Sequence, residues 1–200
     1  MPAIVTPLEP PPPLIPRRKR WTREECQILV ESGTWEIQKL ELINGELISK
    51  MGQNRPHVNA FVWMMEWLLH VFGPGRVNPN TPIDVAPGDN PINEPEPDLI
   101  ALTRPSSSIR TGNVQPGEIA LLVEISDTSL YFDLAVKAPL YSRAGIVEYW
   151  VLDVGGRRLI VHRDPAPSGY GSIIAYSESE SIAPLAAPQH SLSTSQIFAN

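Results

Sequence analysis

The chain of 200 residues has little cysteine, no long apolar run and few basic residues, and each shortage excludes a class of protein. A single cysteine, Cys26, cannot form a disulfide within the chain, which fits a reducing compartment and a cytoplasmic protein. No run of about 18 uncharged apolar residues is present, so we expect no membrane span and no membrane partner. The N-terminus also lacks the basic and then apolar layout of a signal peptide.

Basic charge is scarce outside the N-terminus. Lysine and arginine number 16 against 22 aspartates and glutamates, for a formal net charge of -6. Residues 1–23 hold five basic residues and one acidic residue, a net +4, so the rest of the chain carries -10. An acidic body argues against tight, sequence-independent DNA binding through a broad basic face. It does not exclude a nuclease, because a bound metal reverses the sign of the charge locally.

Proline, in contrast, is abundant, with 22 residues, many of them in the first 16 positions. Because proline fixes φ and lacks an N–H, this segment cannot form a helix or a central strand. We therefore predict a flexible arm over residues 1–20 and a single domain over residues 21–200. Within the arm, Arg17 to Arg20 form either a solvated charge cluster or a segment that contacts phosphate.

Hydrophobic periodicity and turn residues indicate helices and strands in the body. Thr22 followed by Glu25 has the capping-box pattern of a helix start, and Asn44-Gly45 marks the turn of a β-hairpin over residues 36–48. We expect further helices over residues 57–72 and 130–144, and strands near residues 76–78, 83–85, 98–102, 119–125, 148–153, 157–163 and 172–177. This order predicts an α/β (α+β) fold with a mixed central sheet flanked by helices, an N-terminal helix and a β-hairpin.

Two acidic residues lie in runs that read as buried strands. Asp98 heads one apolar run, and Glu124 lies inside another whose apolar residues fill both faces. Strand periodicity places Glu124 and Ser126 on the same face. Because burying one carboxylate is costly and burying two together costs more, a compensating cation is expected. The simpler alternatives are a structural ion pair for Glu124 and a turn cap for Asp98.

A lysine on the predicted helix over residues 130–144 is one candidate for that cation. Asp133 precedes Lys137 by four residues, so an exposed ion pair worth about 0.3–0.5 kcal/mol is the ordinary explanation. Pro139 complicates it, because a proline within a helix removes a hydrogen bond and kinks the chain. Such a kink would aim Lys137 at the sheet, whereas a straight helix with Lys137 in solvent would contradict this role.

Taken together, the motifs resemble the Uma2 family (DUF820), a restriction-endonuclease type common in cyanobacteria. The resemblance covers roughly residues 21–165 and rests on Glu41 to Glu46, His57, Pro97-Asp98, Glu124 to Leu130, Asp133, Lys137, Tyr141, Ala144 to Ile146 and Glu148 to Trp150. It implies the PD-(D/E)XK nuclease fold, Mg²⁺ or Mn²⁺ as the metal, no organic cofactor, and DNA as the substrate.

The resemblance also implies a site. Asp98 and Glu124 would hold the metal, and the backbone carbonyl of Ile125 would complete its shell. The superfamily usually places a lysine two residues after the second acid, but this chain has Ser126 there. Lys137 matches the lysine that the Uma2 pattern takes from the following helix, so Asp98, Glu124 and Lys137 are the implied catalytic residues.

Three further residues are accessory candidates: Glu41, Ser126 and His57. Related nucleases use a first-helix or hairpin acid at the metal, which favours Glu41, although an exposed hairpin charge is an equally simple explanation. His57 stands at a predicted helix start, where a capping or structural role is the common one.

The chemistry expected of this set is metal-dependent hydrolysis of phosphodiester bonds in DNA. Mg²⁺ keeps several waters, so two carboxylates suffice as protein anchors. The metal would activate a water, and the lysine would assist the attacking water or the charged transition state. Cutting both strands calls for two sites, which favours a homodimer.

A catalytically inactive nuclease-fold protein that serves as a binding or assembly module is the alternative. The acidic body and Ser126 favour that alternative, whereas the intact acids and Lys137 favour the enzyme. The direction in which Lys137 points discriminates between the two.

Overall fold

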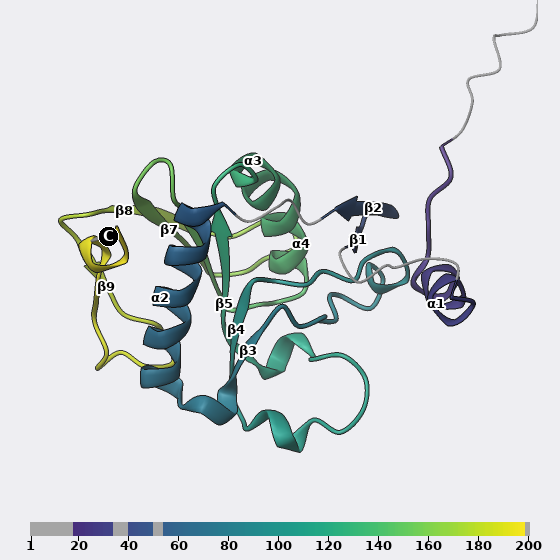
Figure 1. The fold of residues 1–200 in the computed structure, drawn as a ribbon, viewed down its shortest axis with the longest axis horizontal. Helices are drawn as coiled ribbons and strands as arrows, with labels where there is room; N and C mark the ends of the chain where they lie inside the picture. Colours follow the sequence, from purple (N-terminus) through teal and green to yellow (C-terminus); the bar gives the residue numbers. More distant parts are fainter. Residues whose placement is uncertain (1–17, 34–39, 50–53, 199–200) are drawn as a thin grey trace, which may run out of the picture.

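A mixed six-stranded sheet forms the centre of the protein, as seen in a computed structural model that describes residues 18–33, 40–49 and 54–198 (Figure 1). Its strand order is β3-β4-β5-β6-β7-β8, with β5 and β6 parallel and all other neighbours antiparallel. The strands are β3 (Val77–Pro79), β4 (Leu99–Leu102), β5 (Ile119–Ser126), β6 (Glu148–Asp153), β7 (Arg158–Arg163) and β8 (Ser172–Ser177).

Helices cover both faces of this sheet. Helix α2 (Arg55–Phe72) packs Ala60, Met64 and Leu68 against one face (Figure 1). The segment that links β5 to β6 packs on the other face, and it consists of α3 (Leu130–Phe132), η6 (Asp133–Lys137) and α4 (Ala138–Arg143). The predicted mixed sheet flanked by helices is therefore confirmed.

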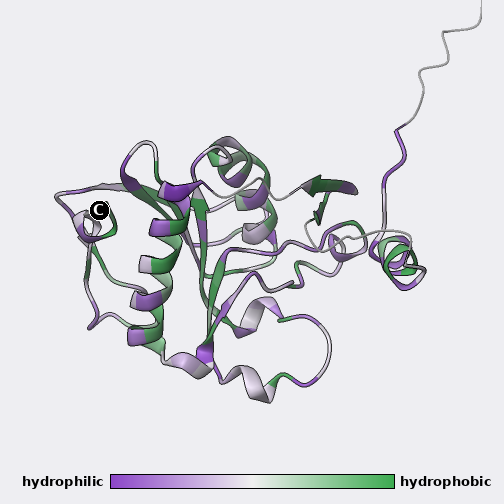
Figure 2. Ribbon diagram, viewed as in Figure 1, coloured by the Kyte–Doolittle hydropathy of each residue, from purple (hydrophilic) through white to green (hydrophobic). Residues whose placement is uncertain are grey.

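Strand β5 lies between the two helical layers that cover the sheet. All eight of its residues are buried, because α2 covers one face and the β5–β6 link covers the other. Figure 2 shows the central strands and the sheet-facing side of α2 in the hydrophobic colours. The expectation that Glu124 belongs to a strand covered on both faces is confirmed.

The predicted hairpin is present as a separate two-stranded sheet, β1 (Leu40–Ile43) and β2 (Glu46–Ser49). Its turn residues Asn44 and Gly45 have φ of 51° and 75°, as an Asn-Gly hairpin turn requires. The Glu94 N–H donates to the Leu42 carbonyl at 2.7 Å, which ties the hairpin to the segment before β4. Residues 36–39 of the predicted hairpin lie outside the described residues.

Helix α1 (Arg23–Glu31) begins with the predicted capping box. The Thr22 hydroxyl accepts from the Glu25 N–H at 3.2 Å, and the Glu25 carboxylate accepts from the Thr22 N–H at 3.0 Å. The chain before α1 lies against the hairpin turn, where the Trp21 N–H donates to the Gly45 carbonyl at 2.8 Å. Most of the predicted arm, residues 1–17, lies outside the described residues.

Two predicted elements differ from the structure. The strand predicted over residues 83–85 is wrong, because Ile83 makes an isolated bridge to Val114 between two flanking prolines. The helix predicted over residues 130–144 is not continuous, because η6 is a π-helix in which the Ala138 N–H bonds to the Asp133 carbonyl five residues earlier.

Short elements complete the chain. They are η2 (Pro74–Arg76), η3 (Asn90–Ile92), η4 (Ser106–Ser108), η5 (Pro116–Glu118), β9 (Ser181–Ile182), β10 (Leu192–Ser193) and η7 (Thr194–Phe198). Within the part of the chain that the structure describes, no helix is long and apolar enough to cross a membrane.

Candidate active site

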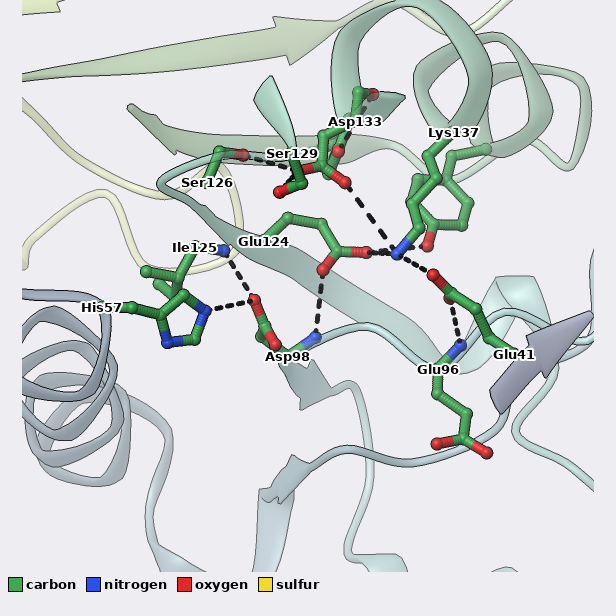
Figure 3. A network of polar contacts seen from close by, with 12 residues as sticks. Glu41, His57, Glu96, Asp98, Glu124, Ile125, Ser126, Ser129, Asp133 and Lys137 are labelled. Atoms are coloured by element: carbon green, nitrogen blue, oxygen red, sulfur yellow. Dashed lines mark hydrogen bonds and ion pairs between the residues drawn. The ribbon is translucent and has the colours of Figure 1, made fainter. Parts of the chain in front are cut away.

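Asp98 and Glu124 lie side by side at the ends of two antiparallel strands. The register pairs Leu99 of β4 with Val123 of β5, so the two acids stand just beyond this pair on the same face. The Asp98 N–H donates to Glu124 Oε2 at 3.2 Å, and the Ile125 N–H donates to Asp98 Oδ2 at 2.7 Å (Figure 3). The backbone of one strand therefore holds the carboxylate of the other.

Glu124 is deeply enclosed, with 3% of its surface exposed, the same fraction as Asp133. Its Oε1 accepts from Lys137 Nζ at 2.9 Å and from the Tyr141 hydroxyl at 3.0 Å. Burial raises the pKa of Glu124 to about 8, against the opposing charge of Lys137 and with a contribution from Asp98.

Lys137 points at the sheet and is 5% exposed, so the predicted direction of this side chain is confirmed. Its Nζ lies 2.9 Å from Glu124 Oε1, 3.0 Å from Glu41 Oε1 and 3.9 Å from Asp133 Oδ1 (Figure 3). Burial disfavours the ammonium, but the three carboxylates outweigh burial and raise the pKa of Lys137. The expected i, i+4 pair with Asp133 is present, but both partners are buried, so it is not the exposed surface pair of the ordinary explanation.

The hairpin supplies Glu41, which is 5% exposed and not the solvent-facing charge of the simpler explanation. Its Oε2 accepts from the Glu96 N–H at 3.3 Å, in the segment that leads into β4. Its Oε1 contacts Lys137 from the side opposite Glu124. The hairpin thus brings a residue from far away in the sequence to the end of β5.

Ser126 supports the site through Asp133. The hydroxyls of Ser126 and Ser129 each donate to Asp133 Oδ2 at 2.6 Å. Burial raises the pKa of Asp133, while Lys137 and the two hydroxyls lower it. Ser126 therefore stands on the same face as Glu124, as predicted, but it contacts the π-helix and not the Lys137 amine.

His57 enters the site from the third position of α2. Its backbone N–H donates to the Asn54 side chain at 3.1 Å. Asn54 is therefore the residue that caps the helix, and His57 is the residue whose N–H is capped. Its side chain also lies in the site, with Nε2 3.7 Å from Asp98 Oδ2 (Figure 3). The buried Nδ1 has no hydrogen-bond partner among the described residues.

A cavity of about 550 Å³ opens between these elements, and we call it the acidic cavity. Six carboxylates and the ammonium of Lys137 line it, together with His57. The carboxylates belong to Glu41, Glu96, Asp98, Glu124, Asp127 and Asp133. This excess of negative charge around one ammonium is unfavourable by itself, and a divalent cation would offset it.

The donor set at the end of β4 and β5 fits a hard cation. Among the described residues, no group of three or more His, Cys, Asp or Glu side chains could hold a metal ion. Asp98 and Glu124 nevertheless present carboxylate oxygens to one cavity, and Mg²⁺ retains several waters in addition to one or two carboxylates. The residues present are those that such an ion uses.

Asp133 and Tyr141 contribute to the site although the sequence assigns neither a role there. The spacing predicts Asp133 only as an ion-pair partner of Lys137, and otherwise both residues belong only to the family resemblance. The signal for Tyr141 is its i+4 spacing from Lys137, which places both on one side of α4 and η6, facing Glu124. The signal for Asp133 is its position four residues after Ser129, because the Asp133 carboxylate accepts a hydrogen bond from the Ser129 hydroxyl.

Fold and site together define a class of protein. A nuclease fold has this arrangement: a mixed sheet lies between helices, two acids stand at adjacent strand ends, and a lysine lies next to them. The sequence matches the Uma2 family, described as "Putative restriction endonuclease", over residues 29–195. The chain therefore belongs to the Uma2 family.

Comparison of structures leads to the same fold. The chain is similar to the crystal structure of a putative nuclease of DUF820 from Anabaena variabilis, with a TM-score of 0.60 and 17% sequence identity. The similarity covers 80% of this chain and 89% of that chain. Among curated proteins, none matches the chain.

Proposed function

We propose that the protein is a metal-dependent endonuclease that hydrolyses phosphodiester bonds in DNA at the acidic cavity. One observation carries the proposal: the Lys137 ammonium lies 2.9 Å from Glu124 Oε1, the other oxygen of Glu124 accepts from the Asp98 N–H, and all three residues line one cavity. A purely structural lysine would neutralise its acids without leaving a cavity of about 550 Å³ next to them. The family and the fold of its solved neighbour support the same class of reaction.

Asp98 and Glu124, with the Ile125 carbonyl, would hold a Mg²⁺ or Mn²⁺ ion. When bound, such an ion lowers the pKa of a water and offsets charge on the scissile phosphate. The protein positions the two acids through backbone N–H groups of the facing strand, so neither carboxylate depends on a flexible loop. This rigidity favours a fixed geometry at the reacting phosphate.

Lys137 is the residue that would act on the phosphate or on the attacking water. Three carboxylates within 4 Å keep its amine protonated, so it would donate hydrogen bonds and not accept a proton. Glu41 and Asp133 hold the ammonium from two sides, and Tyr141 holds its partner Glu124. These three are positioning residues, as are Ser126 through Asp133 and His57 through Asp98.

The test is cleavage of plasmid DNA with Mg²⁺ or Mn²⁺ and with EDTA. Glu124→Gln and Lys137→Met keep side-chain volume, so both variants can be checked for folding by circular dichroism before they are assayed. We expect both to lose at least about 100-fold in rate, while Glu66→Gln on the exposed side of α2 cuts normally. Cleavage that survives in both site variants would overturn the assignment. A folded wild type that binds DNA without cutting it would favour the inactive binding module.

Double-strand cleavage would need two such sites, and we propose a homodimer for that reason. The chain has a mass of 22.1 kDa, so light scattering on the purified protein should give about twice that value. A monomeric mass at assay concentration, together with double-strand cleavage, would overturn the dimer.

A further inference from the structure

A second cavity, of about 300 Å³, lies at the N-terminal end of α2, and we call it the basic cavity. Its walls come from three parts of the chain: the start of α2, the turn between β6 and β7, and the end of η7. The polar side chains in its lining are Arg55, Asn59 and Arg157. All three side chains can donate hydrogen bonds, and among the described residues no carboxylate is part of the lining.

The two arginines differ in how their charge is balanced. Arg157 Nε and Nη2 donate to the Glu178 carboxylate, and the guanidinium lies over the Phe198 ring at 5.1 Å. These contacts fix Arg157 and neutralise its charge, although its Nη1 has no hydrogen bond among the described residues. Arg55 is exposed and has no carboxylate partner within that part of the chain. The uncompensated positive charge at the basic cavity therefore belongs to Arg55.

The basic cavity adjoins the acidic cavity. Asn54 and His57 line the acidic cavity, whereas Arg55 and Asn59 line the basic cavity, so the two cavities flank the first turn of α2 on different sides. A hydrogen bond also links the two surroundings, because the Val154 N–H at the basic cavity donates at 2.9 Å to the carbonyl of Ser126, which stands between Ile125 and Asp127 of the acidic cavity. A chain of phosphates that enters the acidic cavity would pass this cation next.

We infer that the basic cavity binds a backbone phosphate of the DNA strand beside the scissile phosphate, with Arg55 as the anchoring cation. The inference rests on the proposed nuclease function and adds the path of the substrate. An acidic body repels DNA over most of its surface, so an unpaired guanidinium next to the reacting centre supplies local attraction. Arg55 would raise affinity equally for all sequences, because phosphates carry no sequence information.

The experiment measures binding and cleavage separately. Binding of a fluorescein-labelled duplex oligonucleotide is followed by anisotropy in EDTA, over a series of salt concentrations, so that metal-dependent cleavage does not interfere. We expect Arg55→Ala to weaken Kd about tenfold and to lower the slope of log K against log salt by about 1. Arg55→Lys retains the charge and should retain the slope. Arg76→Ala, at the opposite end of α2 and also exposed, should change neither quantity.

Cleavage with Mg²⁺ completes the test. Arg55→Ala should raise KM with kcat unchanged, because this contact is the same in the bound substrate and in the transition state. Equal loss of affinity in Arg55→Ala and Arg76→Ala, or no loss in either, would overturn the phosphate site. Binding that depends on Arg55 without any cleavage by the wild type would overturn the nuclease proposal and leave the phosphate site standing.

Discussion

Glu124 and Glu148 are both buried carboxylates on neighbouring strands, yet their surroundings give them different roles. Glu148 accepts from Arg163, from the Trp150 indole and from the Leu185 N–H, and it lines no described cavity. Glu124 shares Lys137 with two other acids and faces the acidic cavity. A carboxylate with its own arginine is structural, whereas one that competes for a shared ammonium is available to a metal.

Tyr141 offers a test of how tightly Glu124 must be held. Tyr141→Phe removes the hydroxyl that donates to Glu124 Oε1 at 3.0 Å and leaves the ring packing intact. We expect the free energy of unfolding in urea to fall by about 1–2 kcal/mol, since the lost bond is to a charged acceptor. Plasmid cleavage should slow by about tenfold, as for other residues that orient a metal ligand. Tyr131→Phe, at an 82% exposed tyrosine of α3, should change neither, and equal effects of the two variants would contradict this role.

His162 predicts a pH dependence of stability away from the acidic cavity. Its ring is buried in β7 between Tyr149 and Tyr170, and burial lowers the pKa of this histidine below its ordinary 6.5. The unfolded chain therefore binds a proton more readily than the folded one. The stabilisation from neutral His162 is present above pH 6.5 and is lost as pH falls below that value.

This expectation is measured by urea unfolding of wild type and His162→Gln at several pH values. The difference in unfolding free energy between the two should shrink as pH falls from about 7.5 to about 5.5. His70→Gln, at an exposed histidine of α2, should follow the wild type throughout. A wild-type to His162→Gln difference that stays constant with pH would contradict the prediction.

Two elements bring the site together: the π-helix η6 and the β1–β2 hairpin. In η6 the wider turn places Asp133 and Lys137 on the buried side, where each meets a residue of β5. The hairpin crosses to the segment before β4 and inserts Glu41 against the same lysine. Neither element belongs to the central sheet, yet both determine which charges surround Lys137.

Gly45 tests the placement of the hairpin. It has φ of 75°, and a Cβ atom there would lie 2.8 Å from the Cβ of Arg20 and 3.3 Å from the Trp21 carbonyl. We expect Gly45→Ala to lower the free energy of unfolding by about 2–3 kcal/mol, through backbone strain and this collision. Gly112→Ala has a similar φ of 74° with open space around it and should lose only about 1 kcal/mol. Thermal denaturation compares the two, and equal losses would show that the contact with Arg20 is unimportant.

At the scale of the whole molecule, charge is distributed unevenly. The acidic cavity concentrates six carboxylates around one ammonium within a chain of net charge -6. The basic cavity, on the other side of the start of α2, contributes Arg55, which has no carboxylate partner among the described residues. The net negative charge disfavours a polyanion, so under the proposed function the binding of DNA would depend on these two places and on a metal that reverses the local sign.

A stability measurement tests the metal without any cleavage. A cation that binds the folded protein alone stabilises it by about 2.7 kcal/mol at 100 times its Kd, which is about 5–10 °C for a chain of this size. We expect Mg²⁺ or Mn²⁺ to raise the melting temperature of the wild type and of Glu66→Gln by this amount. Asp98→Asn should lose the increase while remaining folded, because it keeps the shape of a partly exposed side chain. An equal increase in Asp98→Asn would place the ion elsewhere.

Local sequence by itself determined most of the elements. The capping box at Thr22, the Asn-Gly turn and the largely apolar run of β5 each depend on neighbouring residues, and all three are present as predicted. The prediction of a strand over residues 83–85 is wrong, because the flanking prolines lack the N–H groups that a longer ladder of hydrogen bonds needs. The helix predicted over residues 130–144 is present as α3, η6 and α4, but its π-turn was not predicted, since a π-turn depends on what its side chains contact in other parts of the chain.

Only the tertiary structure decided what surrounds the acids. Periodicity placed Glu124 and Ser126 on one face, but it could not tell whether Lys137 meets solvent or the sheet, nor that Glu41 from the hairpin would meet it. Nothing in the neighbourhood of Arg55 in the sequence pairs it with Arg157. The physical reason is that hydrogen-bonding pattern and side-chain period are local, whereas electrostatic environment is the sum over groups that folding brings from distant parts of the chain.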